Sequence, residues 1–307
     1  MNPLVGIVYK IISVAIFVAM SVCIKAVAGH VPPGETVFFR SLFAMPVIIV
    51  WLIWRHDLAH GLSTKNPLGH FWRGLVGTTA MGLSFAALGF LPLPEVTAIG
   101  YAAPILTVIF AAMFLGEEVR IFRLAAVALG MAGVLVILSP RLTVFAGGNF
   151  TDTAGLGAML MLMSAVFIAL AQVFIRKLVK TENTAAIVFY FSLTASVLSL
   201  LSLPFGWVIP TLRETVLLVS VGLLGGLGQI FLTTSYRHAP TSVIAPFEYC
   251  SILLAVIAGY VFFDEIPTVP TLAGVSLVIL AGLIIIYRER KLGLERASQR
   301  KVMTPQG

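Results

Sequence analysis

The sequence predicts an all-α membrane protein with ten transmembrane helices, arranged as two inverted repeats of five helices each. Three observations support this fold class: the composition, the number of long apolar stretches and a repeat between the two halves of the chain. Of the 307 residues, 59% are hydrophobic and only 11% are charged, and the mean hydropathy is +1.03. A soluble domain has about 25% charged residues. The composition therefore excludes a soluble enzyme, a nucleic-acid-binding domain and a disordered chain.

A helix that crosses the hydrocarbon core of a membrane needs about 20 mostly apolar residues. The sequence contains ten such stretches, at residues 6–27, 36–54, 72–90, 94–115, 122–139, 154–175, 184–204, 214–235, 241–263 and 270–287. Polar, glycine-rich or proline-rich segments separate them, most clearly at 30–34, 55–71, 91–94, 116–118, 139–153, 176–183 and 264–270. The stretches are too long for strands, and they lack the alternation of apolar and polar residues that a membrane barrel requires.

Lysine and arginine are distributed unevenly among the segments that join these stretches. Sixteen of the 20 fall in one set of alternate segments and three in the other, while Arg40 lies inside the second stretch. The acidic residues divide evenly between the two sets, and only Glu248 lies inside a stretch. Because Lys and Arg accumulate in cytoplasmic loops, we expect both termini to be cytoplasmic and the protein to lie in the inner membrane. The net charge of +7 then reports orientation and not a nucleic-acid partner.

Landmarks of the first half of the chain recur in the same order in the second half. Tyr101 is followed 148 residues later by Tyr249, and Glu117 is followed at the same offset by Glu265. Since five helices are an odd number, a second copy must enter the membrane from the opposite side. Such inverted repeats are typical of alternating-access transporters, whose substrate site lies near the midplane. The predicted organisation is a first repeat at 1–140, a loop at 141–151, a second repeat at 152–288 and a basic cytoplasmic tail at 289–307.

Short motifs in both halves are also similar to those of a known family. They are Glu-Thr-Val-Phe-Phe-Arg-Ser-Leu at 35–42, Ala-Ala-Leu-Gly-Phe-Leu-Pro at 86–92, Leu-Gly-Glu at 115–117 and Phe-Asp-Glu at 263–265. Over about residues 5–288 the chain resembles the EamA branch of the drug/metabolite transporter superfamily. The resemblance implies ten helices in two homologous halves and the export of amino acids, drugs or other metabolites, with aromatic amino-acid exporters as the nearest type. The halves differ at Tyr190, which stands where a counterpart of Arg40 would be expected.

We assign Arg40 and Glu248 to the interior of the predicted helices, and the charged residues near the other helix ends to the adjoining loops. An ionisable group in hydrocarbon costs several kcal/mol unless it faces protein or water, which makes both residues candidates for function. Three roles stay open for Arg40: binding substrate in a cavity, forming a structural pair, or extending to the outer surface. Glu248 is a candidate proton carrier, a cation-binding carboxylate or a packing residue.

Five uncharged polar side chains complete the candidate set for a substrate cavity. They are Tyr101, Gln172, Tyr190, Gln229 and Tyr249. Tyrosine rings can stack on a substrate while their hydroxyls form hydrogen bonds, and a buried amide must be paired. For each of these residues, core packing or a helix-to-helix hydrogen bond is the alternative to substrate binding.

Glycine and proline suggest where helices approach closely and where they bend. Gly77 in the third stretch lies opposite Gly225 in the eighth, and both stretches carry several further glycines. Small residues allow close helix packing, and we expect these two helices to pass near the translocation path. Pro46, Pro104 and Pro246 interrupt their stretches and are candidate hinges, because proline removes a helical hydrogen bond.

The sequence therefore predicts a secondary transporter that exports amino acids or similar small metabolites by alternating access through a central cavity between the repeats. It lacks the phosphate-binding loop of an ATPase and a His-Glu-x-x-His motif, so we expect no enzyme activity, no cofactor and no metal. The expected partners are a small-molecule substrate, the lipid bilayer and, for an antiporter, a proton; the oligomeric state stays open. The alternatives are export of drugs or cationic compounds, an uncoupled facilitator or channel and, less favoured, a membrane-embedded lipid enzyme.

Overall fold

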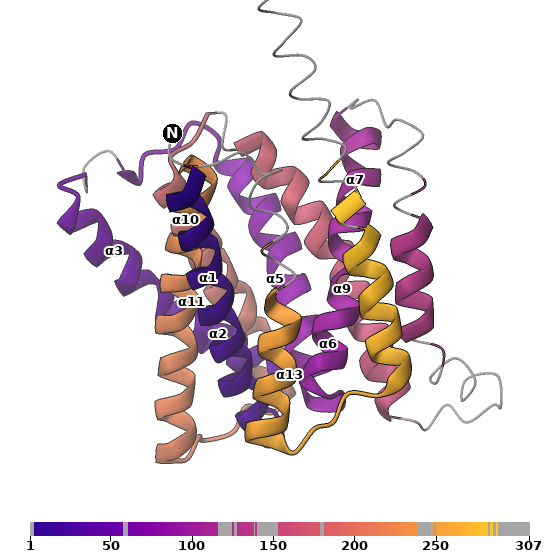
Figure 1. Ribbon diagram of the computed structural model, residues 1–307. Helices are drawn as coiled ribbons and strands as arrows, with labels where there is room; N and C mark the ends of the chain where they lie inside the picture. Colours follow the sequence, from indigo (N-terminus) through magenta and orange to yellow (C-terminus); the bar gives the residue numbers. More distant parts are fainter. Residues whose placement is uncertain are drawn as a thin grey trace, which may run out of the picture.

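The computed structural model describes residues 3–57, 61–115, 125, 128–137, 139, 153–178, 181–238, 247, 250–281, 283–284 and 287. These residues form helices and connecting turns, with no strand among them (Figure 1). The labelled helices are α1 (Pro3–Val27), α2 (Pro33–Leu42), α3 (Ala44–Trp54), α5 (Pro67–Phe90), α6 (Leu93–Gly100), α7 (Ala102–Leu115), α9 (Thr153–Leu178), α10 (Thr184–Ser199), the 3-10 helix η1 (Leu200–Phe205), α11 (Leu212–His238) and α13 (Cys250–Phe263). The prediction of an all-helical protein is confirmed for this part of the chain.

Five helical segments among the described residues are long and apolar enough to cross a membrane. They are Leu4–Val27, Pro33–Trp54, Thr153–Ile175, Thr184–Phe205 and Leu212–Leu232. Three shorter apolar helices, Ala128–Ile137, Cys250–Phe263 and Val269–Ala281, add to them. Each of these segments falls within or over one of the predicted stretches.

The helix that corresponds to the third predicted stretch starts earlier than expected. It was expected to start at residue 72, but α5 begins at Pro67, and the side chain of Asn66 caps it by accepting a 2.9 Å hydrogen bond from the Gly69 N–H. Asparagine before a helix and proline in its first turn are the preferred residues there. The consequence is that Arg73, counted among the loop cations above, lies almost two turns inside the helix.

Two of the predicted helices are interrupted one turn before a proline. α2 ends at Leu42 before α3 starts, and α6 ends at Gly100 before α7 starts. These residues lie four positions before Pro46 and Pro104, respectively. A proline cannot donate to the carbonyl four residues earlier, and its ring collides with that carbonyl. The two prolines therefore account for the breaks, whereas Pro246 lies outside the described residues.

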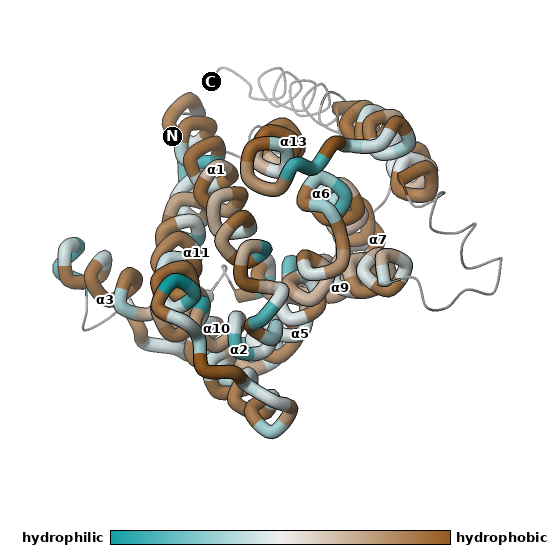
Figure 2. The backbone as a smooth tube through the Cα atoms, turned by 90° about the horizontal axis from the view of Figure 1, so that it is seen from below, coloured by the Kyte–Doolittle hydropathy of each residue, from teal (hydrophilic) through white to brown (hydrophobic). Residues whose placement is uncertain are grey.

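Helices from the two halves of the chain pair in opposite directions. The ring of Tyr9, near the start of α1, lies 5.6 Å from the ring of His238 at the end of α11. Farther along α1, the Ser13 hydroxyl donates a 2.9 Å hydrogen bond to the Gly228 carbonyl. α5 and α9 also run antiparallel, since a Cβ at Gly157, near the start of α9, would lie 2.7 Å from the Cβ of Phe90 at the end of α5. Figure 2 shows α1 beside α11, and α2, α5 and α10 grouped together.

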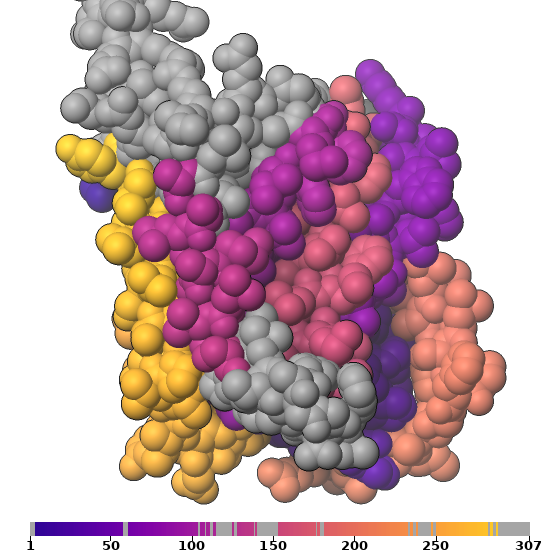
Figure 3. Space-filling view, turned by 90° about the vertical axis from the view of Figure 1, so that its right-hand side faces the viewer, coloured from indigo at the N-terminus to yellow at the C-terminus, as the bar shows by residue number. Residues whose placement is uncertain are grey.

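Large apolar side chains face outward, and small ones fill the contacts between helices. Phe205 and Leu201 are 87% and 70% exposed, whereas Ala87 and Ala165 are fully buried. Helices in a membrane pack through small residues because lipid is as apolar as a leucine side chain. In Figure 3 the golden-yellow segments, which include Val269–Ala281, form the left side of the molecule. This helix meets Ala128–Ile137 so closely that a Cβ at Gly133 would lie 2.7 Å from the Gly274 carbonyl oxygen.

Candidate functional site

Two arginines meet one aromatic ring in the interior of the helix bundle. Arg40 comes from α2 and is 2% exposed, and Arg73 comes from α5 and is 7% exposed. Their guanidinium carbons lie 5.4 Å and 3.9 Å, respectively, from the centre of the Phe191 ring. Phe191 is the eighth of the 16 residues of α10, so this group lies inside a helix that is long and apolar enough to cross the membrane. We call these three residues the arginine centre.

Neither arginine of this centre is neutralised within the described part of the chain. The Nε and Nη1 atoms of both guanidinium groups are buried and have no hydrogen-bond partner there, and neither group forms an ion pair with a described carboxylate. The hydroxyls of Ser41 and Ser192, which directly follow Arg40 and Phe191 in the sequence, are also buried without a partner. Polar groups buried in this way are rare in folded proteins and call for an explanation.

The two charges of the arginine centre carry an electrostatic cost. Because both distances end at the same ring centre, the two guanidinium carbons are at most about 9 Å apart. At an effective dielectric constant of about 20, two like charges at that separation repel by about 2 kcal/mol or more. Burying each charge costs several kcal/mol in addition, whereas a cation on an aromatic ring recovers only about 0.5–2 kcal/mol. The arrangement therefore favours the entry of an anion.

Two glycines make room for the guanidinium groups. A Cβ at Gly225 in α11 would lie 2.9 Å from Arg40 Nε and 3.3 Å from the sulfur of Met20. A Cβ at Gly77 in α5 would collide with Arg73 Nη1 and lie 2.9 Å from the Phe191 ring. Both contacts are closer than ordinary van der Waals separation, so any larger residue would displace its arginine. These glycines are the pair that the sequence repeat aligns.

A second polar cluster lies at the end of the bundle where α5 and α10 begin. His70, one turn before Arg73, has its Nε2 3.2 Å from Glu182 Oε2, and both side chains are buried. Glu182 also accepts a 2.9 Å hydrogen bond from the Lys65 N–H. Burial alone would raise the pKa of Glu182, but the hydrogen bonds from Lys65, His70 and Thr64, with the charge of His70, hold that pKa below its ordinary value. We call this the Glu182 end of the bundle.

Polar links also join the two halves at the opposite end, where α1 and α13 finish. Lys25 Nζ lies 2.9 Å from Glu265 Oε1 and donates a 2.6 Å hydrogen bond to the Leu91 carbonyl. The other carboxylate oxygen of Glu265 accepts a 2.8 Å hydrogen bond from the Leu93 N–H. Glu265 lies just after the end of α13 and connects it to α1 and α6. We call this the Lys25 end.

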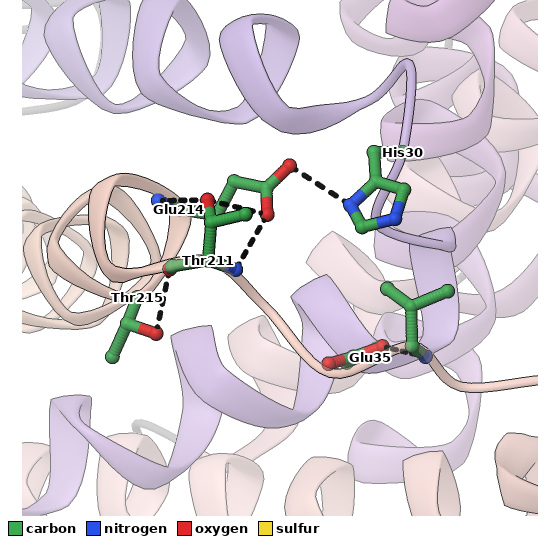
Figure 4. A network of polar contacts seen from close by, with 6 residues as sticks. His30, Glu35, Thr211, Glu214 and Thr215 are labelled. Carbon is green, nitrogen blue, oxygen red and sulfur yellow. Dashed lines mark hydrogen bonds and ion pairs between the residues drawn. The ribbon is translucent and has the colours of Figure 1, made fainter.

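A further network at the Lys25 end ties the loop after α1 to the start of α11 (Figure 4). His30 Nδ1 lies 2.9 Å from one carboxylate oxygen of Glu214. The other oxygen accepts hydrogen bonds from both the N–H and the hydroxyl of Thr211, each 2.8 Å long. Glu35 in α2 accepts a 3.1 Å hydrogen bond from the Val208 N–H in the segment before α11. First-half and second-half segments are thus held together at this end.

Tyr101 and Tyr190, two of the remaining predicted site residues, form their hydrogen bonds outside the arginine centre. Tyr101 is buried at the break between α6 and α7, with its hydroxyl 2.6 Å from Ser251 Oγ in α13. Tyr190 belongs to the Glu182 end: its hydroxyl donates a 3.1 Å hydrogen bond to the Leu62 carbonyl, and its ring lies 5.0 Å from that of His70.

Gln172 in α9 and Gln229 in α11 are partly buried, and Gln229 has an interaction partner. Glu248 and Tyr249 lie outside the described residues. Within the described ranges, no group of three His, Cys, Asp or Glu side chains is placed to hold a metal ion.

The expectation that Arg40 and Glu248 are the only charges inside helices is wrong. Arg73, Lys10 and Glu35 are also buried within helices. Arg73 was missed because the apolar stretch was started at residue 72, which placed this arginine at its margin. The sequence did contain a signal, since Asn66-Pro67 is a typical helix start and places Arg73 well inside the helix.

The sequence also matches known proteins over nearly its whole length. The model of the EamA-like transporter family matches residues 4–139 and 155–288. The chain belongs to this family. It is 31% identical to the pseudopaline exporter of Pseudomonas aeruginosa, covering 93% of this chain and 97% of the relative. It is 27% identical to the S-adenosylmethionine uptake transporter of Rickettsia bellii, covering 94% and 95%.

A solved crystal structure has the same fold, with a TM-score of 0.67 and 21% identity over 94% of this chain and 98% of the other. The relatives of this EamA-family chain move small molecules across membranes. The chain is therefore a membrane transporter of the drug/metabolite transporter type and not an enzyme.

Proposed function

We propose that this EamA-family protein is a secondary transporter that exports amino acids or related small metabolites across the inner membrane by alternating access. The observation that carries the proposal is the arginine centre: two buried cations, unneutralised within the described chain, that lie inside membrane helices and are contacted by helices from both halves of the chain. An ionisable group at membrane depth is a functional site by default. A carboxylate of the substrate would supply the charge that Arg40 and Arg73 lack.

The helix arrangement supports an inverted repeat around this centre. α7 and α13 each contain 14 residues, and their bounds differ by the same offset of 148 that aligns Tyr101 with Tyr249. A two-fold relation between the halves exchanges α1 with α9 and α5 with α11. It therefore exchanges the pair of α1 and α11 with the pair of α5 and α9. These two antiparallel pairs have the most extensive contacts among the described helices. In known transporters such repeats rock against each other about a central site.

The polar links at the Lys25 end are those expected of a transporter that is closed toward the outside. Positive charge predicts that the Lys25 end faces outward, since both termini are expected in the cytoplasm. Lys25 with Glu265 and His30 with Glu214 each bridge the first and second halves. Opening toward the outside would require breaking both bridges, while Pro46 and Pro104, at the breaks in two helices, are the candidate hinges.

Export is the direction we propose, because the relative with 31% identity is an exporter. The uptake transporter among the relatives shows that import also occurs in similar proteins. Drugs or cationic compounds are less favoured as substrates, since a cation would add positive charge beside two arginines that already repel each other. Proton coupling through Glu248 and uncoupled facilitation are the two mechanisms to distinguish.

Counterflow in proteoliposomes tests the proposal. Vesicles that contain the purified protein and an unlabelled amino-acid mixture should take up a labelled amino acid transiently, and empty vesicles should not. Arg40→Gln should abolish uptake. Arg55→Gln, the same change at an exposed arginine at the end of α3, is the matched control and should leave uptake intact. Absence of counterflow for every amino acid and small metabolite offered would exclude this function, and conductance far above carrier turnover would indicate a channel.

A further inference from the structure

The arginine centre narrows the substrate class further. We infer that the transported molecule carries two carboxylates, which together neutralise Arg40 and Arg73. This inference rests on the proposed function, because it assumes that the centre lies on the transport path. It goes beyond that function by selecting acidic metabolites among the small molecules that the family moves.

Charge balance is the first argument. Within the described chain the centre holds two positive charges and no negative one. A neutral amino acid brings one carboxylate together with its own ammonium group, and so leaves the net charge of the centre unchanged. A ligand with two carboxylates places one anion beside each guanidinium. Such charge-assisted hydrogen bonds are about twice as strong as neutral ones.

The free donors and the aromatic ring are the second argument. Each guanidinium has two buried nitrogen atoms without an acceptor, so each can bind a carboxylate of its own. Both groups lie against Phe191, at 5.4 Å and 3.9 Å from the ring centre. The shared ring keeps the two guanidinium carbons at most about 9 Å apart, and two carboxylates joined by a short hydrocarbon chain can span that separation. Dicarboxylates with a few carbon atoms, with or without an amino group, have this shape.

The glycines give the inference a test that does not remove a charge. At Gly77 and Gly225 an added methyl group would displace Arg73 or Arg40, respectively. Gly82 lies in α5 as well, but a Cβ there would have no neighbour within 4 Å. Alanine at Gly77 should therefore weaken binding of a dicarboxylate, while alanine at Gly82 should not.

The experiment measures binding of four probes to the purified protein in detergent: glutamate, glutamine, succinate and inorganic phosphate. Glutamate and glutamine differ only by replacement of one carboxylate with an amide. We expect glutamate and succinate to bind at least tenfold more tightly than glutamine and phosphate. Gly77→Ala should weaken glutamate binding about tenfold, and Gly82→Ala should leave it unchanged. Arg73→Lys, which keeps the charge but loses the planar fork, should bind more weakly than the parent but more tightly than Arg73→Gln.

Each other outcome overturns the inference. Equal affinity for glutamate and glutamine would show that the second carboxylate is not recognised, and preference for phosphate would assign the centre to a phosphate group. Equal effects of Gly77→Ala and Gly82→Ala, in variants that elute as the parent protein on size exclusion, would place the site elsewhere. If counterflow succeeds with a neutral substrate while no dicarboxylate binds, the proposed transport function holds and this inference fails. If counterflow fails with every substrate, the transport function itself fails.

Discussion

Replacing Arg73 with methionine should stabilise the protein in the absence of added anions, and it should remove the affinity for anions. Most changes at a buried residue destabilise a protein, so the direction of this effect is diagnostic. Methionine is unbranched and flexible, fills similar space and leaves no charge against Phe191. The change removes one of the two buried cations whose Nε and Nη1 atoms have no partner in the described part of the chain.

The magnitude follows from three contributions. Loss of repulsion from Arg40 gains about 2 kcal/mol at an effective dielectric constant of about 20. Loss of the contact with the Phe191 ring, 3.9 Å from the guanidinium carbon, costs about 1–2 kcal/mol. Release of the buried charge gains several kcal/mol. We therefore expect a net stabilisation of about 2 kcal/mol or more, which corresponds to a rise in Tm of about 5 °C for a chain of this order of size.

Thermal unfolding followed by scanning fluorimetry in detergent, without added anions, measures this shift. Arg40→Met should give a similar rise, and the double variant should gain about 2 kcal/mol less than the sum of the single variants, because the repulsion can be relieved only once. Arg55→Met at an exposed position should change stability by less than about 0.5 kcal/mol. A fall of several degrees for Arg73→Met would refute the reasoning, since it would mean that Arg73 has a stabilising partner.

Three further predictions concern the polar clusters and Glu248. The lowered pKa of Glu182 means that its ionised form stabilises the fold above its ordinary pKa of 4.5, and that this contribution is lost as pH falls through the lowered value. Glu182→Gln should therefore flatten the dependence of Tm on pH in the acidic range; an unchanged profile would contradict the assignment. Lys25→Met should break the link to Glu265 and open the Lys25 end. In a Cys250→Ser background, a polar maleimide should then label the half-buried Cys23 several-fold faster. Equal labelling rates would show that the link does not hold that end closed. If Glu248 carries a proton, Glu248→Gln should abolish the effect of a pH gradient on transport in proteoliposomes, and a retained effect would exclude it as the carrier.

Most of the helices could be predicted, because they depend on the local pattern of apolar residues in the sequence. The long apolar stretches matched helices such as α9 and α11, since about 20 apolar residues in a row form a helix in a membrane whatever their neighbours are. The break before α3 could also be anticipated from Pro46, because the loss of its N–H is a local effect.

The arginine centre could be predicted only in part. Arg40 was identified from its charge, but its meeting with Arg73 depends on how α2, α5 and α10 pack, and that packing leaves no periodic signal in the sequence. The same limit applies to Tyr190. It was expected at a cavity because it aligns with Arg40, yet its hydroxyl bonds to the Leu62 carbonyl. Tyr190 and Phe191 are neighbours in α10, yet one contacts the Glu182 end and the other the arginine centre, and that difference is set by tertiary contacts.

The two cations and the ring that they share are contributed by different halves of the chain. Arg40 and Arg73 lie in α2 and α5 of the first half, whereas Phe191 lies in α10 of the second. A motion that separates α10 from α2 and α5 would therefore carry the two cations together and leave their mutual repulsion unchanged. What would change is their separation from the ring. The Phe191 ring would then move relative to a fixed pair of charges. The affinity for an anion would therefore differ between the inward-open and outward-open states of the transporter.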